Sequence, residues 1–142
     1  MDKKYEFFEH TADTLFRAYG KNIEEAFSNS ALALTSVVYD IDKIEAKQNK
    51  SIEIVGVDLK SALVHFLSEF VYLMDGEGFI LSKISSITIN KTKEGYRVAA
   101  VAKGDKVSAK YKSHGDVKAV TYNSMEIKEE KGKAYVQVVL DI

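Results

Sequence analysis

YEFFEHTADTLFRAYG, residues 5–20, contains two aromatic-rich runs separated by five polar or small residues. Because aromatic residues favour β-structure, residues 5–8 and 14–19 are each predicted to form a strand, and Gly20 ends the second one. The pentad between them is therefore a tight strand-to-strand connection. Asp13 has an ordinary role there as a turn residue, since its short carboxylate accepts hydrogen bonds from nearby backbone amides.

The other end of the chain reads AYVQVVLDI, residues 134–142, and predicts a terminal strand. Period-two alternation places Asp141 on one face, beside Tyr135 and Gln137. The apolar residues share the opposite face: Ala134, Val136, Val138 and Leu140. The strand ends with two carboxylates, the Asp141 side chain and the α-carboxylate of Ile142. If this strand lies near the first one, Asp13 supplies a third.

Composition limits the class of protein. A chain of 142 residues with 46% hydrophobic and 29% charged residues is typical of one globular domain, here residues 1–142. The chain has no cysteine, which excludes disulfides and thiolate metal sites. No apolar run approaches the roughly 18 residues of a membrane span. We expect a cytoplasmic protein without a signal peptide or a membrane anchor.

Two segments show helical periodicity. Residues 22–38 carry an apolar stripe, and Asn22 followed by Glu25 is a variant of the capping box. A second helix is predicted to begin after the cap residue Asp58 and to end at residues 75–78, where glycine supplies the left-handed conformation. An edge strand is predicted over residues 44–55. Further strands are predicted over residues 79–89, 96–102, 107–112 and 118–128, with a turn at Gly104-Asp105.

These elements predict an α+β fold, in which two helices pack on one side of a mixed or mostly antiparallel sheet. Basic residues concentrate in its late part, because residues 91–118 hold eight Lys or Arg against three Asp or Glu. Such a cluster indicates either a solvated edge that blocks aggregation or a surface for nucleic acid or an acidic partner. The pattern favours the first interpretation.

The motifs of several enzyme classes are missing from the sequence. There is no cysteine nucleophile, no G-x-S-x-G elbow and no phosphate-binding glycine loop. His10, His65 and His114 are scattered, so a zinc site is not predicted. Carboxylates with a chain terminus form an all-oxygen set, which suits calcium, magnesium or manganese. His10 either hydrogen-bonds around the Asp13 turn or supports a metal ligand, and both roles stay open.

Four motifs together resemble the archease family: the opening stretch, NIEEAF, VKAVTYNSM and the ending VVLDI. The similarity covers essentially the whole chain. Archeases are small partner proteins of the RtcB-type RNA ligase of tRNA splicing and bind a divalent metal. The resemblance implies metal-binding positions at Asp13, Asp141 and Ile142, with Lys118 of the KAVTY motif as a further functional candidate. Asn123 departs from the family, since many relatives carry histidine there.

The resemblance implies an accessory protein, not an enzyme, that promotes guanylylation and multiple turnover of its ligase partner. Contact with tRNA would be indirect, and neither a membrane nor a small-molecule substrate is involved. The alternative is a metal-dependent phosphoesterase or nuclease that acts on RNA by itself. Such sites normally gather more carboxylates and histidines than this sequence offers. A third interpretation, a chaperone-like binding module, requires a large exposed apolar patch.

Overall fold

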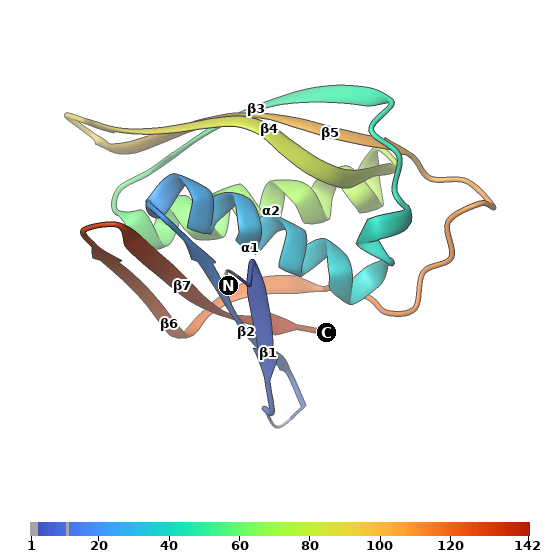
Figure 1. The fold of residues 1–142 in the computed structure, drawn as a ribbon, viewed down its shortest axis with the longest axis horizontal. Coiled ribbons are helices and arrows are strands. Elements are labelled where there is room, and N and C mark those ends of the chain that lie inside the picture. Colours follow the sequence, from blue (N-terminus) through green and yellow to red (C-terminus); the bar gives the residue numbers. More distant parts are fainter. Residues whose placement is uncertain (1–2, 11) are drawn as a thin grey trace.

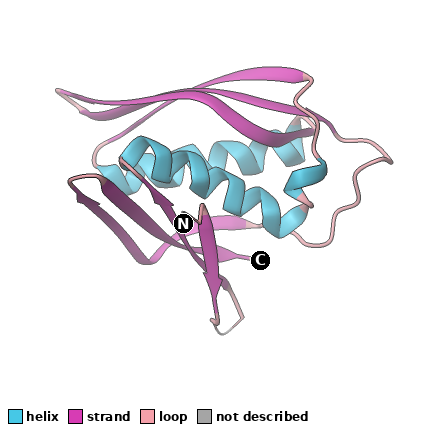
Figure 2. Ribbon diagram, viewed as in Figure 1, coloured by secondary structure: helices cyan, strands magenta, loops and turns pink. Residues whose placement is uncertain are grey.

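The computed structural model describes residues 3–10 and 12–142, so Thr11 of the pentad lies outside the described residues. Two helices lie between two antiparallel sheets (Figures 1 and 2). The four-stranded sheet, here sheet A, has the order β1-β2-β7-β6, and the three-stranded sheet B has the order β3-β5-β4. The elements are β1 (Tyr5–Phe8), β2 (Thr14–Gly20), α1 (Ile23–Val38), the 3-10 helix η1 (Ile41–Lys43), β3 (Gln48–Gly56), α2 (Leu59–Gly76), β4 (Phe79–Thr92), β5 (Gly95–Lys106), β6 (Ala119–Glu130) and β7 (Lys133–Asp141).

Both helices begin at the predicted cap residues. The Asn22 side-chain oxygen accepts from the Glu25 backbone amide at 2.9 Å. Asp58 accepts from the Ser61 amide at 2.8 Å, and the Ser61 hydroxyl accepts from the Asp58 amide at 3.2 Å, which completes a capping box. The chain leaves α2 through Gly78 at φ +66°, the left-handed conformation expected of a glycine terminator.

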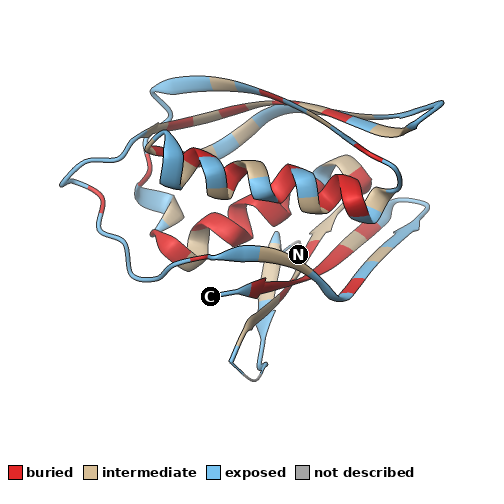
Figure 3. Ribbon diagram, turned by 180° about the vertical axis from the view of Figure 1, so that it is seen from behind, coloured by how far each residue is buried: buried red, intermediate tan, exposed pale blue. Residues whose placement is uncertain are grey.

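The core fills the space between the helices and the two sheets. Buried residues follow the inward stripes of both helices and alternate along the strands (Figure 3). The largest fully buried side chains include five phenylalanines: Phe16, Phe27, Phe66, Phe70 and Phe79. Phe66 packs against Phe27 of α1 and Phe70 of its own helix, with ring centroids 5.9 and 5.1 Å apart. Burial of each such ring contributes about 1.5–3 kcal/mol.

The α+β class and the antiparallel strands are confirmed, but the arrangement differs from the one expected. The strands form two sheets, and the helices lie between them instead of on one side of a single sheet. The difference arises from pairing between distant segments, because β2 pairs with the last strand, β7, whereas β3 pairs with β5. β3 is an edge strand as predicted, although it starts at Gln48 and not at Ile44.

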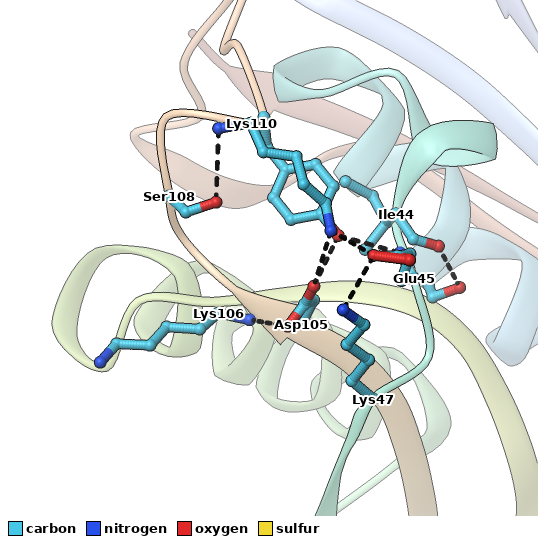
Figure 4. Close-up of polar contacts among 9 residues, drawn as sticks. Ile44, Glu45, Lys47, Asp105, Lys106, Ser108 and Lys110 are labelled. Atoms are coloured by element: carbon cyan, nitrogen blue, oxygen red, sulfur yellow. Dashed lines mark hydrogen bonds and ion pairs between the residues drawn. The ribbon is translucent and has the colours of Figure 1, made fainter.

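The strand predicted over residues 107–112 is wrong, since β5 is followed by an irregular loop up to β6. Tyr111 is buried and its hydroxyl donates to an Asp105 carboxylate oxygen at 2.6 Å. The same oxygen of Tyr111 accepts from the Glu45 backbone amide at 3.2 Å. Lys110 pairs with Glu45 and lies near Asp105 (Figure 4). The aromatic residue is thus a tertiary anchor of the loop and not part of a strand.

The predicted turn at Gly104-Asp105 is also wrong, because both residues belong to β5. A Cβ added at Gly104 would lie 1.9 Å from the Ile80 carbonyl oxygen of β4. Glycine is required here for close approach of two strands. In the part of the chain that the structure describes, no helix combines the length and the apolar character needed to cross a membrane.

Candidate metal centre

Three strand ends of sheet A meet at one place. β2 and β7 are antiparallel with Thr14 opposite Leu140, so the next positions along the register, Asp13 and Asp141, face each other. β6 pairs with the other side of β7, where the Lys118 amide donates to the Asp141 carbonyl at 2.7 Å. We call the group Asp13, Lys118, Asp141 and Ile142 the acid end.

The side chains of the acid end are accessible to solvent. Asp13 is half-buried, whereas Lys118, Asp141 and Ile142 are exposed. The orientation follows from the alternation, because Leu140 points into the core and its neighbour Asp141 therefore points to the open face of sheet A. A ligand or a partner protein can reach the two carboxylates from outside.

The oxygen donors of this end suit a hard divalent cation. Among residues 3–10 and 12–142, no group of three or more His, Cys, Asp or Glu side chains is placed to hold a metal. The side chains of Asp13 and Asp141 supply two carboxylates there. Such a set, completed by water, fits calcium, magnesium or manganese and does not fit zinc.

His10 is the only one of the three histidines that lies at this end. Its Nδ1 atom is 3.9 Å from Asp13 Oδ2, which is within ion-pair range but too long for a hydrogen bond. His65 Nδ1 lies 2.9 Å from the Val55 carbonyl, and His114 Nε2 lies 3.0 Å from the Ser36 carbonyl at the end of α1. The last two histidines therefore belong to other parts of the fold.

Two non-glycine residues of the described chain have positive φ, one directly before Asp13 and one in the bulge of β6 beside Gln137. Ala12 has φ +64° in the turn before Asp13, and Ser124 has φ +52° in β6. Ser124 belongs to a bulge, in which the register between β6 and β7 shifts between Thr121 and Glu126. Non-glycine residues in this region cost on the order of 1–3 kcal/mol and persist only where the surrounding contacts hold them.

Gln137 of β7 supplies such contacts for the bulge. Its side chain is 8% exposed, and Nε2 donates to the Ser124 carbonyl at 2.7 Å. Its Oε1 accepts from Arg17 Nε at 2.9 Å, and the Arg17 guanidinium lies 4.6 Å from the centre of the Tyr135 ring. This network on the open face of sheet A was not predicted. Its one signal in the sequence is a glutamine within an otherwise apolar strand.

The bulge places Asn123 on the surface, where its backbone amide donates to Thr121 Oγ1 at 3.3 Å. Tyr122, beside it, is 54% exposed. Neither side chain is brought among the carboxylates of the acid end by the described contacts. Asn123 is thus a surface residue of the same sheet edge.

Two hollows lie at opposite ends of sheet A. One, of about 730 Å³, borders the acid end and is lined by Phe7, Phe8, Glu9, His10, Asp13 and Thr14. The other, of about 610 Å³, includes Glu6, Tyr19 and Tyr135 in its lining. Burial and the hydrogen bond to Glu6 raise the pKa of Tyr19 to about 12. Tyr19 therefore keeps its proton at neutral pH and is a hydrogen-bond donor, not a base.

Comparisons with known proteins find one family, and the matches cover nearly the whole chain. A profile of the Archease protein family (MTH1598/TM1083) matches residues 5–142. The chain is 38% identical over 141 residues to a Methanosarcina mazei protein named "Protein archease", covering 99% of this chain and 97% of that protein. A Pyrococcus abyssi protein of the same name is 39% identical over 142 residues, covering 99% of both chains. The solution structure of Methanobacterium thermoautotrophicum protein 1598 is similar, with a TM-score of 0.82, 33% identity and coverage of 98% of this chain and 99% of that chain. The chain belongs to the archease family.

Proposed function

We propose that this protein is a cytoplasmic accessory factor of an RtcB-type RNA ligase in tRNA splicing, which promotes guanylylation of the ligase and its multiple turnover. One observation carries the proposal: the register of sheet A brings Asp13 opposite Asp141 at an exposed end of the molecule. Membership of the archease family supplies the identity of the partner. The protein itself is not an enzyme in this proposal, and any contact with tRNA is indirect.

The acid end would hold one divalent cation through Asp13, Asp141 and the α-carboxylate of Ile142. A bound cation neutralises charge on phosphate oxygens and so favours phosphoryl or nucleotidyl transfer at a partner's active site. Lys118, which directly precedes β6 and whose amide donates to the Asp141 carbonyl, would contact a phosphate or an acidic residue of the partner. His10, 3.9 Å from Asp13, would orient that carboxylate or share its charge.

The scarcity of groups at the acid end supports an accessory role. Enzymes that cleave RNA with metals usually gather several carboxylates and a base around one or two ions. Within the described part of this chain, no group of three or more His, Cys, Asp or Glu side chains is placed to hold a metal. A partner that brings its own nucleotide and metal chemistry makes up for what this site lacks.

The test is a ligation assay with limiting ligase, GTP and manganese. Wild-type protein should raise the number of turnovers per ligase, and Asp13→Asn or Asp141→Asn should lower that stimulation by about tenfold or more, since each removes a ligand charge. Asp75→Asn is the matched control, because Asp75 is an exposed acid of α2 and does not belong to sheet A. Full stimulation by both acid-end variants would contradict the proposal.

Isothermal titration with calcium, magnesium and manganese tests the metal directly and without the ligase. Binding should be lost in Asp13→Asn and Asp141→Asn and kept in Asp75→Asn. Incubation of the pure protein with RNA and manganese separates the alternative function, since cleavage that depends on Asp13 would identify a nuclease.

A further inference from the structure

Exposed apolar side chains gather around the acid end. In the described part of the chain, four of the eight exposed large hydrophobic residues lie here: Phe7 (43% exposed), Phe8 (41%), Tyr122 (54%) and Ile142 (43%). Phe7 and Phe8 end the edge strand β1 on one side of the acids, and Tyr122 belongs to the edge strand β6 on the other. These four residues, here the apolar rim, therefore flank two carboxylates from both sides.

The two phenylalanines point to opposite faces of the β1–β2 hairpin, which projects from the body of the protein (Figure 1). Phe7 is opposite Phe16, and its ring centroid lies 5.9 Å from those of both Phe16 and Tyr5. Phe8 is opposite Leu15, and the Arg17 guanidinium lies 5.7 Å from its ring centre. Both rings are thus held in place before any partner binds, which lowers the entropy cost of a contact.

The hollow of about 730 Å³ joins these rings to the acid end, because Phe7, Phe8 and Asp13 all line it. Glu9 lies in the same lining and adds a further negative charge. A surface that fits this end must offer apolar contacts around a charged centre. Apolar contacts that exclude water also strengthen the electrostatic interactions that they surround.

We propose that the apolar rim is the docking surface for the RtcB-type ligase, and that Phe7 and Phe8 pack against apolar side chains that border the ligase's nucleotide-binding centre. This inference rests on the proposed function and extends it from the acids to the residues that hold the two proteins together. The acids determine the charge that the partner must carry, and the rim supplies most of the binding free energy. Aromatic residues held in place beside a desolvated charged centre are the common form of such hot spots.

The test measures the dissociation constant of the purified ligase with the full chain by calorimetry. Phe7→Ala/Phe8→Ala should raise it about 30-fold or more, the effect of one or two lost hot-spot residues. Val57→Ala/Tyr72→Ala is the matched control, because Val57 (78% exposed) and Tyr72 (55%) are exposed apolar residues that belong to neither sheet. The control should bind like wild type.

Metal titration of the same variants separates the rim from the acids. Phe7→Ala/Phe8→Ala should keep the metal affinity of wild type, whereas Asp13→Asn should lose it. If the double variant does not fold, the single variant Phe8→Ala tests the docking surface. It leaves the packing of Phe7 on Phe16 intact and should still weaken ligase binding about tenfold. Unchanged ligase binding by folded Phe variants would overturn the proposal that the apolar rim is the docking surface and would leave the proposed function standing. A wild-type protein that does not bind the ligase would overturn both.

Discussion

Sheets A and B cover opposite sides of the same two helices, but their open faces differ. The open face of sheet B carries mainly short side chains at its centre, namely Ser51, Ser86, Thr88, Ala99 and Val101, together with one exposed ion pair between strands, Glu53–Arg97. The open face of sheet A carries long side chains that contact one another across strands, including Arg17, Tyr135 and Gln137. Sheet A also ends in the acids and the apolar rim.

The difference teaches that stability and recognition are divided between the sheets. Sheet B covers one side of the helices, and its open face carries mostly the short side chains that are common on solvent-exposed strands. Sheet A covers the helices on their other side, and it also holds a polar network around the buried Gln137 and two backbone positions with positive φ, one of them directly before Asp13. Because such features cost stability, their concentration in one sheet indicates where the protein meets other molecules.

A cavity in the helical layer, which both sheets cover, should destabilise both sheets at once. Phe66→Ala removes a fully buried ring between α1 and α2 and should lower the free energy of unfolding by about 3–5 kcal/mol. Urea denaturation measures the loss. Hydrogen exchange of β5 and β7 amides shows whether sheets A and B open together, and separate opening of one sheet would argue against a common core.

A change in sheet B should affect stability alone. Gly104→Ala places a Cβ 1.9 Å from the Ile80 carbonyl oxygen, so β4 and β5 must move apart, at a cost of about 1–3 kcal/mol. Metal affinity at the acid end should stay that of wild type. Ser86→Ala, on the exposed face of the same sheet, should change stability by less than about 0.5 kcal/mol. A weaker metal affinity in folded Gly104→Ala would show that sheet B also controls the site.

A change in sheet A should affect stability and recognition together. Gln137→Met keeps the shape of the side chain but leaves Arg17 Nε and the Ser124 carbonyl without their partner, at a cost of about 1–2 kcal/mol. The bulge that carries Tyr122 should loosen, and stimulation of the ligase should fall while metal binding persists. A variant with lower stability and full stimulation would confine the network to a structural role.

The smallest effect concerns acid stability at the loop next to sheet B. The hydrogen bond from Tyr111 lowers the pKa of Asp105 below its ordinary value of 3.8. A lowered native pKa adds stability that is present above that ordinary value and is lost as the pH falls through the native pKa. Tyr111→Phe should therefore flatten the decline of the urea midpoint in acid. An unchanged acid profile would show that another carboxylate causes the loss of stability in acid.

The sequence was most informative where structure depends on neighbouring residues. The cap residues Asn22 and Asp58, the glycine exit at Gly78 and the β1–β2 hairpin were all predicted, because each follows from a few adjacent side chains. Tyr111 shows the limit of this reasoning. Its alternating neighbourhood predicts a strand, but the contact with Asp105 and Glu45 in the fold holds it in a loop.

The site illustrates the same division. Asp13 and Asp141 were singled out by the resemblance to the archease family together with their places in the sequence, yet only the pairing of β2 with β7 brings them opposite each other. The apolar rim could not be predicted, since Phe7 and Phe8 have the pattern of ordinary strand residues. Their exposure results from the position of β1 at the edge of sheet A, which depends on strand order.

The place of β7 between β2 and β6 also determines the order in which the protein can fold. The strands of sheet B and α2 come from one continuous part of the chain, so they can assemble early. Sheet A lacks an inner strand until the last strand inserts, and Arg17 and Gln137, which then meet, are 120 residues apart. Closing so long a loop is slow. The acid end is therefore expected to form last, so that a chain in which Asp13 and Asp141 face each other is also a chain that has finished folding.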